Sequence, residues 1–319
     1  MARQSVVVTG GAGFIGSHLA TAVAGDGAAV VVVDDLSSGR ADRVPAEARL
    51  AQLDITHRDA LIRLFDEVRP SRVFHLGAQS SVTRSVADPP RDCEINVQGT
   101  LNVLDAAERH QAPVTFASTG GALYGNEAPI PTPESAAPTP LAPYGASKWA
   151  GEAYVSTWAR ASGVPHAVCR LGNVYGPRQS PHGEAGVIAI FAYQLWSGSS
   201  PTVFGHGRPT RDYVHVHDVV EAMLRASGRS GTYNVATGTE TSVQTILDLI
   251  QDAAGIKLTA TYAPLRQGEL ERSCMDPSRA QRELGWSPRY QLADGVRQTV
   301  RALLEEFETD AAHKYPIRP

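Results

Sequence analysis

The sequence predicts an α/β protein: a doubly wound parallel sheet covered by helices on both faces, followed by a smaller α/β lobe. Two patterns carry this prediction. Short, continuous apolar runs alternate with helical segments through the first half of the chain, as in strands that are buried on both faces. A glycine-rich turn joins the first run to the first helix. We expect a nucleotide-binding domain over residues 1–175 and a substrate lobe over 176–319, with residues at about 211–240 returning to the first domain.

The strands expected in the first half are short apolar runs, several of them rich in β-branched residues, and the helices between them are longer. The expected strands are 5–9, 29–33, 49–53, 72–76, 114–117 and 167–171. The expected helices are 14–24, 58–68, 92–110 and 144–161. Because strand and helix alternate, neighbouring strands should run parallel.

The composition changes after residue 124, where six prolines stand between residues 129 and 143. Proline lacks an amide donor and blocks helices, so this segment should be an irregular loop, and a long loop inside a compact domain suggests a function. After residue 176 the alternation ends. There we expect helices at 187–196, 243–254, 277–284 and 292–307, and strands at 210–216 and 233–235.

Composition and charge argue against several classes of protein. The net charge of −4 over 319 residues gives no electrostatic reason to expect nucleic acid or an anionic membrane as partner. The sequence shows no apolar run of membrane-spanning length and no signal peptide before the first strand, so we expect a cytoplasmic protein. The three cysteines lack metal-ligand spacing. We predict no metal site and expect His75, His215 and His217 to be packed or hydrogen-bonded.

The turn after the first strand has the spacing of a dinucleotide-binding loop. Gly11, Gly13 and Gly16 fit G-x-G-x-x-G, and Gly10 with the last two fits G-x-x-G-x-x-G. The missing side chains allow a tight turn and the close approach of phosphate, while the following helix presents its first amides to a pyrophosphate. The strand–turn–helix context makes this a Rossmann-type site.

Acidic residues follow two strands at the same edge of the expected sheet. Asp34 and Asp35 come about twenty positions after the glycine loop, where a carboxylate accepts the hydroxyls of an adenosine ribose and repels a 2′-phosphate. NAD is therefore favoured over NADP. Asp54, followed by Ile55, comes after the third strand. It could accept from the adenine amino group, or it could cap the helix that starts at residue 58.

Tyr144 and Lys148 lie on one face of an expected helix because they are four positions apart. A free tyrosine has a pKa of about 10, and lowering it by about three units requires about 4 kcal/mol. The Lys148 ammonium and the positive nicotinamide ring of NAD⁺ would both stabilise the phenolate. Downstream of a nucleotide loop, this pair predicts a redox enzyme that uses the tyrosine as its base.

Two hydroxyl residues, Ser118 and Thr119, end the fifth strand. A parallel sheet places ligand-contacting groups at the carboxyl ends of its strands. Either hydroxyl could therefore hydrogen-bond the oxygen that is oxidised.

With these motifs the chain resembles the extended short-chain dehydrogenase/reductases, and within them the nucleotide-sugar epimerases, most closely bacterial UDP-glucose 4-epimerases. The similarity covers nearly the whole chain. It rests on segments 10–19, 34–39, 75–79, 96–100, 118–125, 144–148, 172–178 and 211–216. The resemblance implies that NAD is held by Gly10, Gly13, Phe14, Ile15, Gly16, Asp34, Asp35, Ser38, Gly39, Asp54, Ile55, Leu76, Gly77, Ala78, Gln79, Asn96, Ser118, Tyr144 and Lys148.

The resemblance also implies a mechanism. Tightly bound NAD⁺ takes a hydride from carbon 4 of the sugar while Tyr144 takes the hydroxyl proton. The 4-keto sugar then presents its other face, and hydride and proton return. The chain departs from the family pattern at Gly120, where relatives commonly have Ser or Thr, so the hydroxyl role passes to Ser118, Thr119 or a water.

The same segment separates this chain from related enzymes. Sugar 4,6-dehydratases place an Asp-Glu pair where this chain has Gly121 and Ala122, and neither of these can transfer a proton. The glutamate of the decarboxylating relatives is absent as well. The pattern leaves simple reversible oxidation.

By resemblance, the substrate contacts Ser80, Thr119, Gly120, Asn173, Val187, Arg211, Arg266 and Ser273. Arg211 and Arg266 match the contacts to the diphosphate, whose charge attracts guanidinium groups. Ser273 stands where some epimerases have a bulky tyrosine against the sugar, so we expect an N-acetyl group at carbon 2 to fit.

The leading hypothesis is reversible epimerisation at carbon 4 of UDP-glucose and UDP-galactose. One alternative is a UDP-glucuronate 4-epimerase, in which Arg84 or Arg178 would face the uronate, or another nucleotide-sugar epimerase. Another is a non-catalytic NAD-binding protein, which only Gly120 favours. By resemblance, helices 92–110 and 144–161 pair in a homodimer. The sequence does not identify the physiological sugar.

Overall fold

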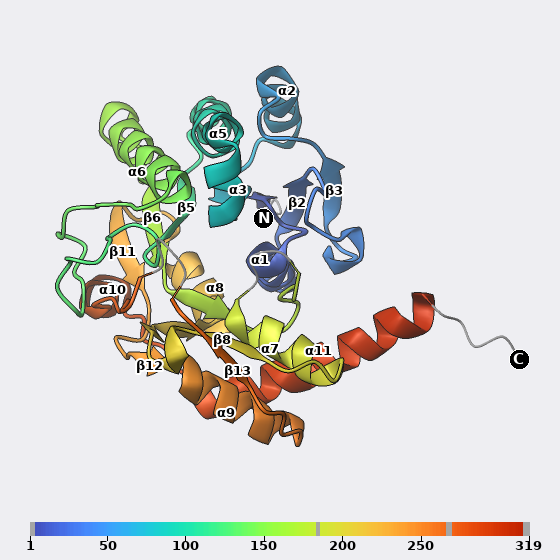
Figure 1. The fold of residues 1–319 in the computed structure, drawn as a ribbon. Helices are drawn as coiled ribbons and strands as arrows, with labels where there is room; N and C mark the ends of the chain where they lie inside the picture. The colour runs from blue at the N-terminus through green and yellow to red at the C-terminus, as the bar shows by residue number, and fades with distance from the viewer. Residues whose placement is uncertain (1–3, 183–185, 266–269, 315–319) are drawn as a thin grey trace, which may run out of the picture.

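A seven-stranded sheet forms the centre of the computed structural model, which describes residues 4–182, 186–265 and 270–314. The strand order is β11-β6-β5-β4-β1-β2-β3, and every neighbouring pair is parallel (Figure 1). The strands are β1 (Ser5–Thr9), β2 (Ala29–Asp34), β3 (Arg49–Gln52), β4 (Arg72–His75), β5 (Val114–Thr119), β6 (Ala167–Leu171) and β11 (Gly231–Val235). The predicted parallel α/β sheet is confirmed.

Hydrophobic cores lie on both faces of the sheet because successive strand residues point to opposite faces. Val6 and Val8 belong to one core, and Val7, between them, belongs to the other. The first core is covered by α1 (Phe14–Gly25), α8 (Val216–Ala226) and α10 (Ser278–Leu284). The second is covered by α2 (Arg58–Val68), α5 (Gly99–Glu108) and α6 (Pro143–Ser162), which form the upper layer in Figure 1.

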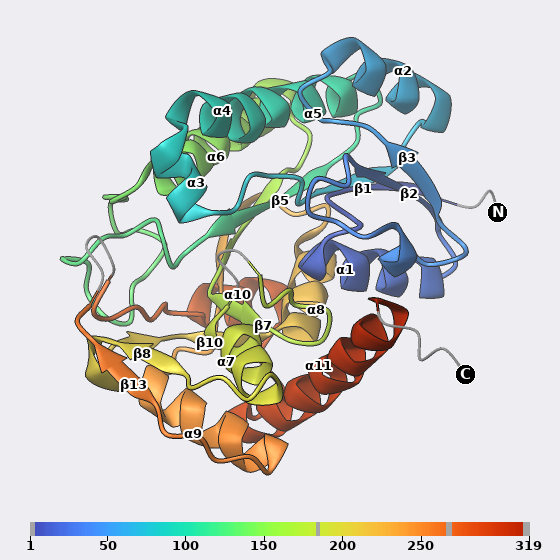
Figure 2. The same ribbon diagram turned by 45° about the vertical axis from the view of Figure 1, so that its right-hand side comes forward.

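A third core lies in the later part of the chain, between helices and short strand pairs (Figure 2). Its helices are α7 (Val187–Trp196), α9 (Val243–Ala254) and α11 (Leu292–Lys314). The parallel pairs are β7 (Asn173–Tyr175) with β10 (Tyr213–His215) and β8 (Thr202–Phe204) with β13 (Thr261–Ala263). The antiparallel pair is β9 (Thr210–Arg211) with β12 (Thr241–Ser242). Short 3₁₀ turns are η1 (Ala41–Arg43) and η3 (Gly205–Gly207).

The single helix expected at 92–110 is wrong in detail. Helix α3 (Val82–Ala87) precedes it, and α4 (Pro89–Cys93) leads into a π-helical stretch, η2 (Glu94–Gln98), before α5 begins. Such stretches often occur at functional sites. This one carries Asn96, whose side chain bonds to three different partners.

The strand expected at 210–216 is also wrong. It is interrupted at Asp212, whose carboxylate accepts from the amides of Thr237, Gly238 and Met275, and the chain enters α8 at Val216. Helix α11 also runs beyond the expected residue 307, to Lys314. These differences arise from contacts between distant segments, which local periodicity does not contain.

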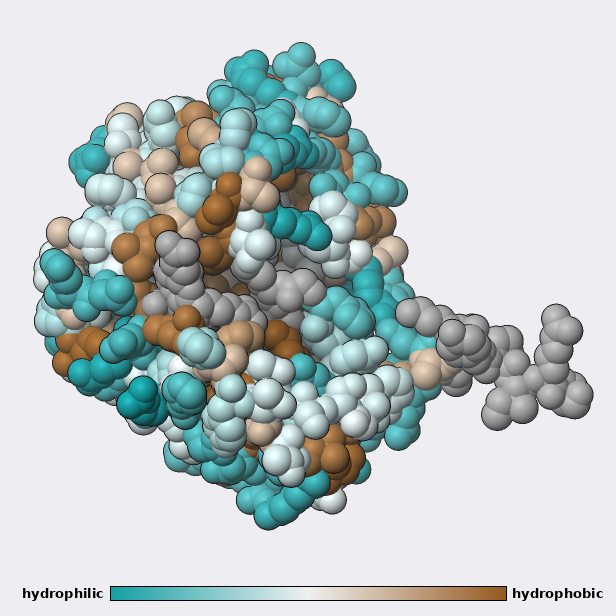
Figure 3. Space-filling view, viewed as in Figure 1, coloured by the Kyte–Doolittle hydropathy of each residue, from teal (hydrophilic) through white to brown (hydrophobic). Residues whose placement is uncertain are grey.

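The proline-rich segment after β5 is irregular, as predicted, and it is tied to the later part of the chain. Thr132 accepts from the amide of Asp276 and donates its own amide to the carbonyl of Cys274. Among the helices of the described residues, none combines the length and hydrophobicity that a bilayer crossing requires. In the space-filling view, hydrophobic side chains lie around the middle of the face while hydrophilic ones dominate its rims (Figure 3).

Candidate active site

The turn between β1 and α1 is packed too closely for side chains. Gly10 has a φ of +69°, and a Cβ atom there would lie 2.7 Å from the backbone nitrogen of Gly77, just after β4. A Cβ atom on Gly16 would lie 2.0 Å from the carbonyl oxygen of Gly10. In the described part of the chain, no side chain caps α1 at Gly13, and its first turn holds no acid. The first amides of α1 are therefore open to a pyrophosphate. The first turn consists of Phe14, Ile15 and Gly16.

The two acids after β2 have different surroundings. The carboxylate of Asp34 is buried and accepts from the amides of Ala12 and Leu36, both at 3.0 Å. Burial raises the pKa of Asp34, although these two amides oppose the effect. Asp35 is exposed, and its carboxylate accepts from the amide and hydroxyl of Ser37 in the same turn. Ser38 is exposed as well. Asp34 is thus the acid that lies against the glycine loop.

Gly39 brings the loop after β2 back over Asp34. A Cβ atom on Gly39 would lie 2.8 Å from a carboxylate oxygen of Asp34 and 2.9 Å from the Cβ of Ala12. The glycine loop and the segment 34–39 therefore form one compact wall, and its residues fit a dinucleotide that lies along α1.

Asp54 does not cap helix α2. The helix is preceded by His57, which makes no side-chain cap, so the capping alternative is wrong. Partial burial would raise the pKa of Asp54, but the hydrogen bonds of Thr56 and the ion pair with Arg91, at 3.2 Å, hold it below its usual range. The neighbouring Ile55 is buried.

The segment after β4 is fixed to the surrounding helices through Asn96. The Asn96 side chain accepts from the amide of Gln79 at 2.9 Å, and it donates to the Gln79 carbonyl at 2.9 Å and to Ser147 Oγ at 3.1 Å. The Gly77 amide donates to Thr9 Oγ1 at 3.0 Å. This segment also holds Leu76, Ala78 and the exposed Ser80.

His75 is a buried, hydrogen-bonded side chain, as expected. Thr100 donates to the Asn96 carbonyl and so accepts from His75 Nε2 at 3.0 Å, while Thr9 lies 2.7 Å from Nδ1. Burial, together with the charge of Lys148, lowers the pKa of His75 to about 3. The ring is therefore neutral. No group of three or more potential metal-ligating side chains occurs among the residues that could be described.

Tyr144 and Thr119 meet through a side-chain hydrogen bond at the carboxyl end of β5. Burial raises the pKa of Tyr144 to about 12, the charge of Asp92 adds to this effect, and the bond with Thr119 opposes it. In the protein alone the phenol is thus held in its protonated form. A phenol beside a hydroxyl is a group that can give and take a proton at a sugar oxygen.

Lys148 is buried one helical turn after Tyr144 on α6, and its ammonium bonds to the backbone. Its Nζ donates to the carbonyl oxygen of Ala117 at 2.9 Å and lies 4.7 Å from the centre of the Phe116 ring. Burial lowers the pKa of Lys148 to about 8, against the opposing charges of Asp92 and Glu152. Burial and the charge of Asp92 raise the pKa of Tyr144, so the acidification of the phenol that was expected from Lys148 and NAD⁺ together is not seen in the protein alone.

Ser118 belongs to a buried ion-pair network and not to the phenol. Its hydroxyl donates to Glu152 at 2.5 Å, and Glu152 forms an ion pair with Arg170 at 2.6 Å. Arg170 also donates to the Tyr124 hydroxyl and to the Glu134 carbonyl. The hydrogen of the Ser118 hydroxyl is already committed to a carboxylate, which favours Thr119 over Ser118 as the reacting hydroxyl.

Gly120 is covered by a methionine from the other end of the chain. A Cβ atom on Gly120 would lie 1.8 Å from the sulfur of Met275, which is itself buried. A side chain at position 120 is therefore incompatible with Met275 as it is placed. A Cβ atom on Gly121 would lie 3.4 Å from Asn173 Oδ1, so Asn173 lies beside the same segment.

The remaining expected substrate residues lie in the later part of the chain. Thr210 links two of them: its carbonyl accepts from Arg211 Nη1 at 2.8 Å and from the Ser273 amide at 3.2 Å. Ser273 lines a small pocket together with Gly120 and Met275. Val187 is the first residue of α7. Arg266 lies outside the described residues.

Two buried acids, Asp92 and Glu152, were not predicted from the sequence: the charge of Asp92 acts on the phenol of Tyr144, and that of Glu152 acts on Lys148. Tyr144, Lys148 and Glu152 follow one another at intervals of four residues, which places all three on one face of α6. Asp92 accepts from Gln79 and Asn96. A spacing of four residues links Glu152 to Lys148 and Asp92 to Asn96. This spacing was a signal in the sequence, but it does not identify the more distant residues that the two acids contact.

Comparisons with known proteins agree with this arrangement. The family model described as GDP-mannose 4,6 dehydratase matches residues 7–299. The chain belongs to this family. A UDP-glucose 4-epimerase from Mycolicibacterium smegmatis is 43% identical over 303 residues, which cover 92% of this chain and 96% of the relative.

Solved structures match over almost the whole length. A UDP-glucose 4-epimerase from Thermotoga maritima, crystallised with UDP-glucose, has a TM-score of 0.93 and 40% identity, covering 95% of this chain and 100% of its own. A UDP-glucose 4-epimerase from Thermus thermophilus, in complex with NAD, has a TM-score of 0.89 and 40% identity, covering 94% and 99%. The predicted resemblance to extended short-chain dehydrogenase/reductases of the epimerase type is confirmed.

Proposed function

We propose that the protein is an NAD-dependent UDP-sugar 4-epimerase that interconverts UDP-glucose and UDP-galactose. The pairing of Tyr144 with Thr119 at the carboxyl end of β5 supports this proposal, because a parallel sheet binds its ligands at that edge and a phenol there can transfer a proton. The relatives from three bacteria that bear the name UDP-glucose 4-epimerase support it.

The cofactor site is assigned to the wall formed by the glycine loop and Asp34. The loop is free of side chains where a pyrophosphate would lie, and the Asp34 carboxylate lies next to it to accept the ribose hydroxyls. Asp54 and the segment from Leu76 to Gln79 complete the site along the sheet edge. When bound, NAD⁺ supplies a hydride acceptor at carbon 4 and a positive charge near the phenol.

Tyr144 takes the proton of the hydroxyl on carbon 4 and later returns it, while Thr119 orients the same oxygen by a hydrogen bond. In the protein alone, the pKa of the Tyr144 phenol lies well above 7, at about 12, and the pKa of Lys148 lies at about 8. The decisive lowering of the phenol pKa therefore has to come with the ligands. This arrangement makes proton transfer dependent on an occupied site.

Elimination of water is disfavoured in spite of the name of the family model. At the positions of the dehydratase acid pair, this chain has Gly121 and Ala122. The acids that lie nearby are committed elsewhere: Glu152 to Arg170, and Asp92 to Gln79 and Asn96. Neither of these two acids is therefore free to donate a proton to a leaving hydroxyl.

The range of sugars is set around Ser273 and Asn173. Ser273 lines the pocket next to Gly120, so we propose that UDP-N-acetylglucosamine also turns over. A uronate is disfavoured because Arg178, one of its candidate partners, donates instead to Ser17 on α1 at 3.2 Å. Arg211 and Arg266 are assigned to the diphosphate.

We further propose a cytoplasmic homodimer that pairs through α5 and α6. Trp149 and Tyr154 are large exposed side chains on α6, and such side chains are frequent in interfaces. Sedimentation at micromolar concentration should give twice the monomer mass of 34.0 kDa. A monomer would contradict the proposed assembly but not the proposed reaction.

The experiment that tests the function is incubation with a panel of nucleotide sugars, without added reductant, followed by separation of the products. UDP-glucose should give UDP-galactose, with UDP-glucuronate as the discriminating substrate. A protein that retains NAD but converts no member of the panel would support the non-catalytic alternative.

A further inference from the structure

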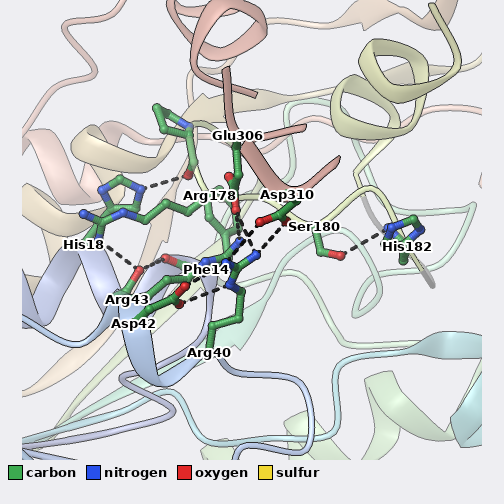
Figure 4. Close-up of polar contacts among 12 residues, drawn as sticks. Phe14, His18, Arg40, Asp42, Arg43, Arg178, Ser180, His182, Glu306 and Asp310 are labelled. Atoms are coloured by element: carbon green, nitrogen blue, oxygen red, sulfur yellow. Dashed lines mark hydrogen bonds and ion pairs between the residues drawn. The ribbon is translucent and has the colours of Figure 1, made fainter. Parts of the chain in front are cut away.

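A cluster of ion pairs joins the C-terminal helix to the loop after β2 (Figure 4). Arg40 Nη1 lies 2.8 Å from a carboxylate oxygen of Asp310, and Arg43 Nη2 lies 2.7 Å from a carboxylate oxygen of Glu306. Arg40 Nη1 also lies 3.7 Å from Glu306. Two arginines of one segment thus meet two acids that are one helical turn apart on α11.

The loop that carries these arginines is part of the cofactor wall. The backbone amide of Arg40 donates to the carbonyl of Ala12 in the glycine loop at 3.0 Å. Gly39, the residue before it, is packed against Asp34 and Ala12. Arg40 therefore connects the glycine loop, which its backbone amide binds, to α11, which its guanidinium binds.

The inner ion pair is the better protected one. The side chain of Arg43 is only 11% exposed and that of Glu306 is 25% exposed, whereas Arg40 and Asp310 are each about 40% exposed. An ion pair shielded from water is weakened less by salt and contributes more than an exposed pair. We therefore expect Glu306 to contribute more than Asp310.

Glu306 also acts on a third arginine. Arg178 donates to Ser17 Oγ on α1 at 3.2 Å. Burial and the charge of Arg43 lower the pKa of Arg178, and the charge of Glu306 opposes them. The carboxylate of Glu306 therefore acts on three guanidinium groups, those of Arg40, Arg43 and Arg178, the last of which bonds to α1.

The position of α11 makes this contact a link between distant parts of the chain. Its ion pairs hold the end of α11 against the loop after β2, although the helix packs on α7 and α9 as far as Phe307. Asp310 lies in the part of the helix that extends beyond the expected end at residue 307.

We propose that Glu306 and Asp310 are positioning residues for the cofactor: by fastening α11 to the loop that carries Arg40 and Arg43, they hold the cofactor wall closed and slow the release of NAD. The inference rests on the proposed function. An enzyme whose cofactor is reduced and reoxidised within one turnover gains nothing from exchanging it, so slow release suits the reaction.

The test compares NAD release from two variants of α11. The double variant Glu306→Gln/Asp310→Asn removes both acids of the link. The control, Glu305→Gln, removes an acid that pairs with Arg301 on the same helix at 3.4 Å. Each protein is loaded with NAD⁺ and freed of excess, and an added alcohol dehydrogenase with ethanol converts only the released NAD⁺ to fluorescent NADH.

The double variant should release NAD about tenfold faster than the wild type, as expected from losing two partly screened ion pairs. The control should match the wild type, and the KM for UDP-glucose and the kcat at saturating NAD should change less than about twofold. High salt should speed release from the wild type more than from the double variant. Circular dichroism and thermal unfolding check that all variants are folded.

Unchanged or slower release from a folded double variant would overturn the inference. Slower release would mean that the acids only repel the pyrophosphate and that the freed arginines attract it. The charge exchange Arg43→Glu/Glu306→Arg should restore slow release relative to Glu306→Arg alone. A wild-type protein that holds no NAD would refute the proposed function itself, which separates that failure from this one.

Discussion

Ser118 and Thr119 are neighbours at the end of β5, yet their hydroxyls have opposite surroundings. Ser118 donates to Glu152 inside a buried network in which Arg170 occupies the other carboxylate positions. Thr119 lies at the carboxyl end of β5 and bonds to the phenol of Tyr144. The first hydroxyl is needed by the fold, and the second is available to a substrate.

The difference shows how this chain separates structure from chemistry along one helix. Glu152, about two turns after Tyr144 on α6, has both carboxylate oxygens hydrogen-bonded, whereas the side chain that bonds to the phenol is the neutral Thr119. A buried ion pair with complete hydrogen bonding fixes a position but cannot exchange protons easily. The group proposed to react is the phenol, because it is not held in an ion pair and can still exchange a proton with a ligand.

Replacing Tyr144 by Phe should have the largest effect. We expect kcat to fall by about 10³-fold, because removal of a general base typically costs factors of this order. NAD content and thermal unfolding should stay close to the wild type, since the phenol makes no contact that the sheet depends on. Turnover within about tenfold of the wild type would contradict the role of Tyr144 as base.

The comparison of the two hydroxyls is sharpened by a pair of alanine variants. Thr119→Ala should lower kcat by about 10²-fold with little effect on stability. Ser118→Ala should keep most of the activity but lower the free energy of unfolding by about 1–3 kcal/mol, because Glu152 loses a buried donor. Steady-state kinetics and urea unfolding of both proteins decide the matter. The reverse pattern would assign the reacting hydroxyl to Ser118.

Gly120 offers a way to restore the hydroxyl that the family commonly has. Gly120→Ser alone should destabilise the protein by about 1–3 kcal/mol, because the new side chain collides with Met275. Adding Met275→Ala should recover part of this loss and, if Thr119 is also replaced by Ala, part of the activity. Additive effects in the double-mutant cycle would show that the two positions do not interact.

The buried neutral histidine predicts a smaller, pH-dependent effect. The pKa of His75 is about 3 in the fold against 6.5 unfolded, so the unfolded chain binds more protons between these values. Stability from His75 is present above pH 6.5 and is lost as the pH falls, by about 2 kcal/mol at pH 5. Urea unfolding of the wild type and His75→Gln at neutral pH and at about pH 5 should show a smaller loss for the variant. Equal losses would mean that His75 is not kept neutral.

The sheet was predictable because its signals are local. Local sequence patterns predicted β6, α7 and α9 with the bounds that the structure shows, at 167–171, 187–196 and 243–254. The glycine loop and the spacing of Tyr144 and Lys148 likewise pointed to the two halves of the site. Sequence patterns predict the structure within about one supersecondary unit, because the contacts there are local.

The rest depends on contacts between distant segments. Met275 covers Gly120 from about 155 positions away, and Asp212 breaks an expected strand because it meets three amides from later segments. The sequence also predicted help from Lys148 without showing that burial and Asp92 would raise the phenol pKa. Burial and long-range partners decide such features, and neither follows from spacing.

Reversible oxidation at carbon 4 is tested most directly with UDP-glucose that carries deuterium at that carbon. The wild-type protein is incubated with this substrate in ordinary water, and the UDP-galactose formed is examined by mass spectrometry and NMR. The label should remain at carbon 4 of the product, because the hydride that leaves is returned to the same carbon within the site. Replacement of the label by solvent hydrogen would contradict transient oxidation at the Tyr144 site.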